Sequence, residues 1–145
     1  MRVPVSLLLL LLCACAEPTA EPAPVVIAEE SRYRVIAEAT PIEPGVGMLD
    51  LRVEATGGWH IAPEAPVRLD IEAFEVTFSP AKLRAEHART LDEDAIEWSC
   101  EFRADKVSGS TATAQLKFGI CEGPAEKCVI IRREVEIPIG VALAK

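Results

Sequence analysis

The sequence is poor in aromatic side chains, in histidine and in the glycine patterns that bind phosphate groups. Aromatic residues make up 5% of the chain, and there are only two histidines. We find no internal repeat, no phosphate-binding glycine loop and no constellation typical of hydrolases. Only residues 81–89 have a composition that favours a helix. These absences argue against nucleotide-dependent enzymes, and we expect no cofactor.

Runs of basic residues are also missing. The chain has 15 Lys and Arg against 23 Asp and Glu, which gives a formal net charge of −8. An acidic protein without a basic stretch is repelled by phosphate backbones and anionic headgroups. We therefore expect no nucleic acid partner, and any membrane attachment must come from something other than surface charge.

Long apolar runs are confined to the first residues. Residues 6–12 are almost entirely leucine and follow a short positive start, but a spanning helix needs about 20 apolar residues. A positive start, a short apolar core and small residues are typical of a signal peptide. The residues Leu12, Cys13, Ala14 and Cys15 resemble the lipobox of bacterial lipoproteins.

That resemblance implies a signal peptide over residues 1–14, cleavage before Cys15, and lipid on Cys15 that holds the protein to a membrane. The alternative is an ordinary secretory signal whose cysteines are incidental. Ala16 and Glu17 follow the cysteine, and the absence of Asp there favours the outer over the inner membrane. We thus expect a cell-envelope protein that faces the periplasm.

The rest of the chain divides by composition. Residues 15–30 begin with Ala, Glu, Pro and Thr, which bury little, so we expect the lipidated cysteine and a tether there. Residues 31–145 have the size of one domain. Apolar residues recur there with period two between turn residues, which predicts about seven strands. We expect an all-β, immunoglobulin-like sandwich of two antiparallel sheets.

Three cysteines remain in this domain, and strand parity sorts them by environment. Cys100 alternates with Ser99 and Glu101 and shares the parity of Trp98 and Phe102, which predicts a buried thiol. Cys121 and Cys128 each share the parity of polar side chains, which predicts that both lie on the solvent face. If the residues between them form a hairpin, the two cysteines face each other within disulfide range.

Such a pair has two interpretations. A bridge across a short hairpin loop can be a permanent structural disulfide, which is common in exported proteins. An exposed pair can instead take part in thiol:disulfide exchange, because an attacking thiolate can reach one of its sulfurs. Spacing and composition leave both open.

Two segments carry a resemblance to a known family. Gly58-Trp59-His60-Ile61-Ala62-Pro63, followed by Pro66-Val67-Arg68-Leu69, and the strand Lys117-Phe118-Gly119-Ile120-Cys121 with Cys128-Val129-Ile130-Ile131, resemble the periplasmic N-terminal domain of DsbD-type thiol:disulfide interchange proteins. The resemblance covers about residues 46–141. The family usually has a shorter spacing between its cysteines, and an aromatic residue and proline after the second.

The resemblance implies an immunoglobulin-like sandwich in which Cys121 and Cys128 are the redox pair. It also implies partners: a membrane electron carrier that supplies electrons, and thioredoxin-like or Dsb-type periplasmic proteins that receive them. The alternative is a non-enzymatic envelope lipoprotein that binds another protein or serves structure, with the same pair as a permanent disulfide.

Trp59 and His60 have interpretations that require no function. A Trp after a Gly-Gly turn is usually a core residue, and its neighbour a solvated or hydrogen-bonded imidazole. His60, His87 and the cysteines have metal-binding side chains, but their spacing matches no metal-site pattern, and we expect no metal.

Overall fold

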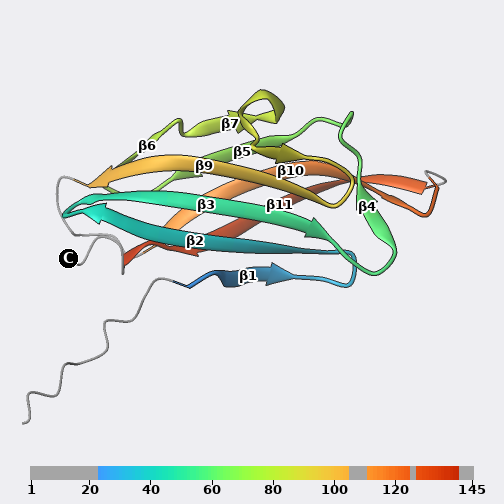
Figure 1. The fold of residues 1–145 in the computed structure, drawn as a ribbon, viewed down its shortest axis with the longest axis horizontal. Helices are drawn as coiled ribbons and strands as arrows, with labels where there is room; N and C mark the ends of the chain where they lie inside the picture. Colours follow the sequence, from blue (N-terminus) through green and yellow to red (C-terminus); the bar gives the residue numbers. More distant parts are fainter. Residues whose placement is uncertain (1–22, 105–110, 125–126, 141–145) are drawn as a thin grey trace, which may run out of the picture.

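The computed structural model describes residues 23–104, 111–124 and 127–140. In these residues the strands form two antiparallel sheets (Figure 1), which confirms the predicted all-β, two-sheet sandwich. A 3-10 turn at Ala85–His87 interrupts the strands. Among the described residues, no helix has both the length and the apolar character that crossing a membrane requires.

The first sheet, sheet A, has the strand order β1-β2-β3-β9-β6. β8 pairs with the other end of β9, on the same edge as β6. The long members of sheet A, β2, β3 and β9, pair over nearly their whole lengths. The strands are β1 (Val25–Glu29), β2 (Tyr33–Glu43), β3 (Val46–Ala55), β6 (Val76–Ser79), β8 (Thr90–Leu91) and β9 (Ala95–Ala104).

The second sheet, sheet B, has the order β11-β10-β5-β7, and β4 also pairs with β10. Because β11 pairs with β10 along its full length, β5 and β4 must share the other edge of β10. The strands are β4 (Trp59–Ile61), β5 (Arg68–Glu72), β7 (Lys82–Arg84), β10 (Thr111–Glu122) and β11 (Lys127–Pro138). The β10–β11 hairpin and β4 therefore lie together at one end of the sandwich (Figure 1).

The seven predicted strands correspond to β2, β3, β5, β6, β9, β10 and β11. Of the four others, β4, β7 and β8 have three residues or fewer, too few for a periodic pattern to stand out, and β1 lies in the stretch expected as tether. Of the stretch expected as tether, Val25–Glu29 is strand: its apolar residues pair with β2 and bury Ala28. Residues 81–89 form β7 and the 3-10 turn rather than a regular helix.

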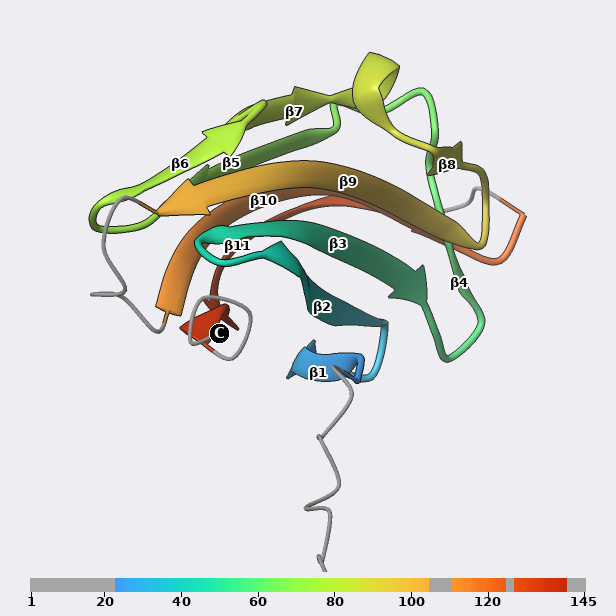
Figure 2. The ribbon, with the colours of Figure 1, turned by 60° about the vertical axis from the view of Figure 1, so that its left-hand side comes forward.

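The core lies between the two layers (Figure 2), where side chains at alternate positions are buried along much of the long strands. Tyr33 of sheet A meets Phe118 of sheet B edge to face, with ring centroids 5.3 Å apart. Trp98 is also enclosed, and its Nε1–H donates to the backbone oxygen of Arg84 at 3.1 Å. Packed aromatic and aliphatic side chains of both sheets thus hold the layers together.

A charged contact closes the gap between the edge strands of the two sheets. Arg133 has the inward parity of its β11 neighbours, and its Nη1 donates to the Glu30 carboxylate and, at 3.4 Å, to the Tyr33 hydroxyl. Glu30 follows β1 directly, so this contact joins β11 to the β1–β2 connection. An inward-pointing charge on an edge strand also discourages pairing with a foreign strand.

Candidate functional site

The two cysteines assigned by sequence are brought together at the hairpin end of sheet B. Cys121 near the end of β10 is the register partner of Cys128 near the start of β11, and their Cα atoms are 4.0 Å apart. The two sulfurs form a disulfide with an S–S distance of 2.06 Å. The predicted cross-strand pairing is therefore confirmed.

The two halves of the disulfide differ sharply in exposure. Cys128 is exposed, whereas Cys121 is only 2% exposed. Cys121 lies on the outer face of sheet B together with Cys128, but the prediction that it is open to solvent is wrong. Cys128 is therefore the half of the disulfide that lies at the surface, and Cys121 is the half that the fold covers.

Cys121 is buried because other parts of the chain cover the outer face of sheet B near it. The loop after β4 crosses that face over Gly119, two residues before Cys121: the Ala62 N–H donates to the Gly119 oxygen at 2.9 Å. A Cβ added to Gly119 would lie 2.5 Å from the Cβ of Ala65, closer than two carbons can approach. The absence of a side chain at Gly119 thus lets the loop lie on the sheet.

A tight turn places β4 against this end of β10. Gly57 and Gly58 both have positive φ, 63° and 80°, which favours glycine at both central positions of the tight turn between β3 and β4. The Trp59 N–H donates to the Thr56 oxygen at 3.1 Å and closes the turn. Trp59 is half-buried against the core, and the Arg32 guanidinium carbon lies 5.4 Å from its ring centroid.

His60 is the register partner of Cys121 on the side away from Cys128. Paired residues on adjacent strands project to the same face, so the imidazole, the buried sulfur and the exposed sulfur lie in one row across β4, β10 and β11. His60 is half-buried. An imidazole beside a cysteine can hydrogen-bond or protonate a thiolate when the disulfide opens.

Cys100 stands apart from this row. It is a free thiol on β9, 4% exposed, as its parity with Trp98 and Phe102 predicts. Burial, with a smaller contribution from the Asp50 carboxylate, raises the pKa of its thiol to about 12. Cys100 is therefore a core residue with almost no thiolate at neutral pH.

The remaining candidates are not gathered at one place. His87 ends the 3-10 turn, where its Nδ1 accepts a hydrogen bond from the Arg84 N–H at 2.9 Å. In the part of the chain that the structure describes, no three His, Cys, Asp or Glu side chains are placed to hold a metal ion. Cys15, the predicted lipidation site, lies outside the described residues.

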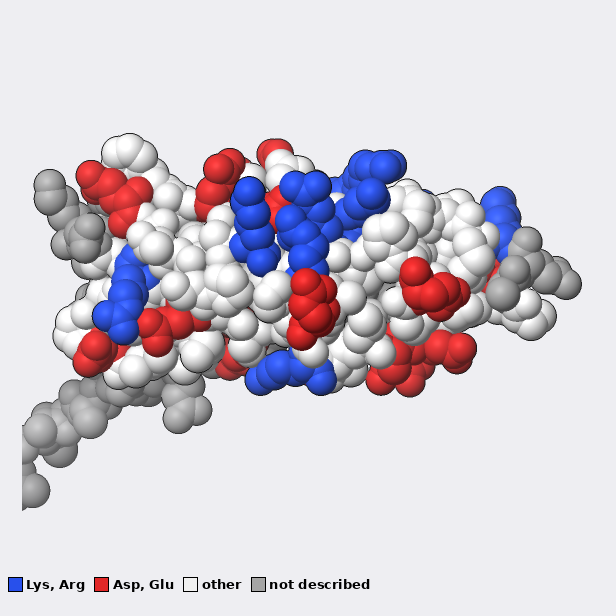
Figure 3. All heavy atoms as spheres, turned by 90° about the horizontal axis from the view of Figure 1, so that it is seen from above, with Lys and Arg blue, Asp and Glu red and all other residues white. Residues whose placement is uncertain are grey.

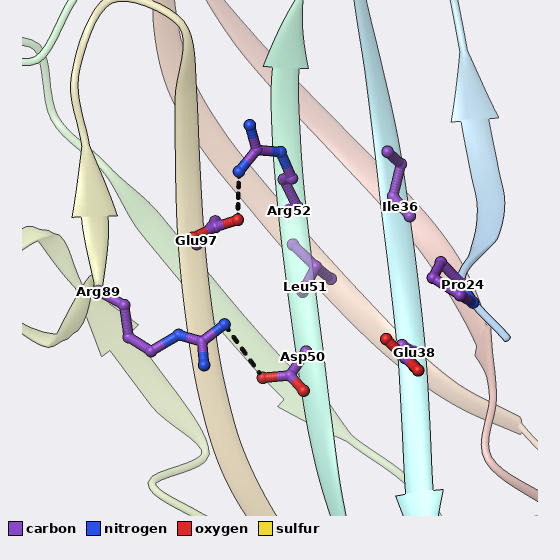
Figure 4. Close-up of a pocket in the computed structure, with 8 residues that line it drawn as sticks. All are labelled: Pro24, Ile36, Glu38, Asp50, Leu51, Arg52, Arg89 and Glu97. Carbon is purple, nitrogen blue, oxygen red and sulfur yellow. Dashed lines mark hydrogen bonds and ion pairs between the residues drawn. The ribbon is translucent and has the colours of Figure 1, made fainter. Parts of the chain in front are cut away.

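A second surface that we did not predict is a hollow on the outer face of sheet A (Figure 4), lined among others by Arg52, Arg89 and Glu97. Both arginines that line it contact carboxylates, and a further carboxylate, that of Glu38, also lines it. Arg52 pairs with Glu97 and also contacts Glu54 through Nε at 2.7 Å, and Arg89 Nη2 lies 3.4 Å from Asp50 Oδ1. Arginine opposite carboxylate across adjacent strands is a common stabilising pattern, so this hollow needs no ligand to account for it.

Comparisons with known proteins identify the fold and not a family. No model of a protein family matches the chain, and no curated protein matches it in sequence. Among solved structures, the yeast GGA1 GAE domain is similar with a TM-score of 0.52 and 13% identity, over 80% of this chain and 99% of that one. At this identity the similarity shows a shared β-sandwich architecture alone.

Two further solved structures have lower scores. The GAE domain of GGA2p from Saccharomyces cerevisiae has a TM-score of 0.49 and 9% identity, over 81% of this chain and 98% of that one. The N-terminal periplasmic domain of ScsB from Proteus mirabilis has a TM-score of 0.42 and 12% identity, over 80% of this chain and 50% of that one.

Proposed function

We propose that this protein is a lipid-anchored module of the cell envelope that takes part in thiol:disulfide exchange through Cys121 and Cys128. The observation that carries the proposal is the unequal exposure of the two cysteines. A purely structural bridge needs no accessible sulfur, whereas exchange needs one sulfur that can be reached and one that can leave. Cys128 supplies the first and Cys121 the second.

A thiolate of the reduced electron donor, which the proposal takes to be a membrane electron carrier, attacks Sγ of Cys128. The bond between the two cysteine sulfurs breaks, and Cys121 leaves with the electron pair and takes up a proton. The second thiolate of the partner then attacks its own bound sulfur and releases Cys128. The module gains two electrons, and the partner leaves as a disulfide.

Trapping tests this order of attack. Cys121→Ser leaves the exposed Cys128 without its resolving partner, and we expect it to accumulate mixed disulfides with envelope oxidoreductases. The matched variant Cys128→Ser leaves only the buried Cys121 and should capture far less. Equal capture by both variants would contradict the assigned order of attack.

The reduction potential of the pair separates exchange from the alternative function. Structural disulfides of exported proteins have potentials below about −300 mV, beyond the reach of the proposed partners, whereas exchange proteins lie above this value. We expect the Cys121–Cys128 pair above it in equilibrium titration with a thiol redox buffer. A lower value together with no trapping would favour a non-enzymatic binding or structural lipoprotein with a permanent disulfide.

The lipid anchor is a separate part of the proposal and has its own test. The lipobox resemblance around Cys15 supports it. We expect the wild type to fractionate with membranes and to incorporate labelled fatty acid, and Cys15→Ala to do neither, while Cys13→Ala behaves as the wild type. Unchanged membrane fractionation of Cys15→Ala would contradict anchoring at this residue.

A further inference from the structure

Four basic side chains form an unbroken row across the outer face of sheet B. The register pairs Arg84 with Arg68, Arg68 with Lys117, and Lys117 with Arg132, so each of the strands β7, β5, β10 and β11 contributes one. Three strand spacings make this cationic row about 14 Å long. Figure 3 looks down on the β7 edge and shows Lys and Arg side chains gathered near the middle of the molecule.

The row is unusual because its charges are largely uncompensated. Asp70 accepts from Arg68 Nη2 at 2.6 Å and from Arg84 Nη1 at 2.9 Å, so one carboxylate serves two guanidinium groups. No ion pair among the described residues includes Lys117 or Arg132. Like charges directly opposite one another on adjacent strands destabilise a sheet. The requirements of folding therefore do not explain the row, in contrast to the paired charges of sheet A.

The row lies on the same face as the disulfide, and its last member, Arg132, is on the same strand as Cys128. Along β11 the outward residues Cys128, Ile130 and Arg132 alternate with inward ones, and Ile130 is 43% exposed. Arg132 is the fourth residue after Cys128 along β11, which places the two about 13 Å apart. A molecule seated over the exposed sulfur would meet an apolar side chain next and the cationic row after it.

We propose that the cationic row, together with Ile130, is the docking surface for the exchange partner, and that this partner carries acidic side chains about 13 Å from its reactive cysteine. This inference rests on the proposed exchange function. The complementary charge argues for the occupant: an acidic segment neutralises the row and places its own sulfur over Cys128. Opposite charges of this kind mainly accelerate association and fix orientation.

Synthetic peptide thiols test the surface without a known partner. Three peptides of equal length each carry one cysteine in an extended chain. Four residues from the cysteine, the first peptide has three Glu, the second three Gln and the third three Lys. The measurement is the second-order rate of mixed-disulfide formation with the oxidised full chain in an uncharged detergent. At low ionic strength we expect the Glu peptide to react about tenfold faster than the Lys peptide, and this advantage to disappear in high salt.

Charge reversal locates the effect on the protein. In Lys117→Glu/Arg132→Glu the preference for the Glu peptide should be abolished or reversed. The rate of each peptide with the variant is compared with the rate of the same peptide with the wild type, which cancels differences in thiol reactivity between the peptides. The control Arg34→Glu/Arg103→Glu makes the same change in net charge on the outer face of sheet A, where both side chains are exposed, and should keep the preference. Equal rates for the three peptides with the wild type, or equal loss in the control, would overturn the docking surface.

Two further measurements separate this inference from other outcomes. Mercaptoethanol is uncharged and needs no docking, so it should open the wild type and the Lys117→Glu/Arg132→Glu variant at the same rate. Failure of mercaptoethanol and of all peptides to open the disulfide would refute the exchange function itself. Row-dependent binding to anionic vesicles, combined with equal peptide rates, would assign the row to lipid and overturn the docking surface.

Discussion

Reducing the Cys121–Cys128 disulfide should weaken the domain without unfolding it. The bridge joins residues seven apart, and in the chain-entropy model a closed loop of about eight residues stabilises by about 2.5 kcal/mol. Domains of this size have unfolding free energies of about 5 to 15 kcal/mol. The two β-sheets and the core between them do not depend on the bridge, so the reduced protein should remain folded at 25 °C.

Thermal and urea unfolding with and without reductant measure this change. A loss of about 2.5 kcal/mol corresponds to a Tm about 10 °C lower for roughly 120 residues. The variant Cys121→Ala/Cys128→Ala should be less stable than the oxidised wild type, and its stability should be the same with and without reductant. If reduction alone unfolds the wild type at 25 °C, the pair cannot cycle in a working protein, and our reasoning for exchange would be refuted.

Three other predictions concern the rest of the domain. Cys100 should resist alkylation by iodoacetamide in the native protein and react only on unfolding, because burial raises its thiol pKa to about 12; native labelling followed by mass spectrometry would expose an error here. Gly119→Ala should destabilise the domain by about 1 to 3 kcal/mol in urea unfolding, since its methyl group would collide with Ala65, and a neutral effect would contradict the close approach of the loop. Hydrogen bonds from Thr90 and Arg52 hold the pKa of Glu97 below its usual value. Because a lowered folded-state pKa stabilises the fold above the unfolded pKa of about 4.3, this stability is lost as pH falls through the lower folded value. The loss, followed by urea unfolding between about pH 6 and 2, should be smaller in Arg52→Gln.

Strand parity predicted the architecture well because the long strands alternate cleanly. The parity of Cys100 with Trp98 and Phe102 placed it in the core, and the structure buries all three. The facing positions of Cys121 and Cys128 followed from the hairpin. Both conclusions depend only on neighbours along one strand or across one turn, which a single sequence contains.

Parity failed where distant segments decide the outcome. It assigns Cys121 correctly to the outer face, but it does not show that β4 pairs with β10 beside Cys121 or that the loop after β4 lies over this face at Gly119. Arg133 is a charged residue at an inward position of β11 for a similar reason: its guanidinium contacts the carboxylate of Glu30, about a hundred residues away, at the edge of the sheet. The cationic row could have been found only with the registers of three strand pairs, and no local pattern contains them.

The contact between Glu30 and Arg133 also sets how far the disulfide reaches. β1 runs toward the hairpin end, so Val25, five residues before Glu30, lies farther from that end than Glu30 does (Figure 1). β11 begins at the hairpin end, so Cys128, five residues before Arg133, lies nearer to that end than Arg133 does. At about 3.3 Å per residue, the exposed sulfur is carried roughly 33 Å past the point where the chain enters the domain. If Cys15 is the anchor, an upright module presents its cysteine far above the bilayer, where soluble proteins diffuse. Contact with cysteines at the membrane surface would require the sandwich to lie flat, so the tilt of the domain would select between the two classes of partner.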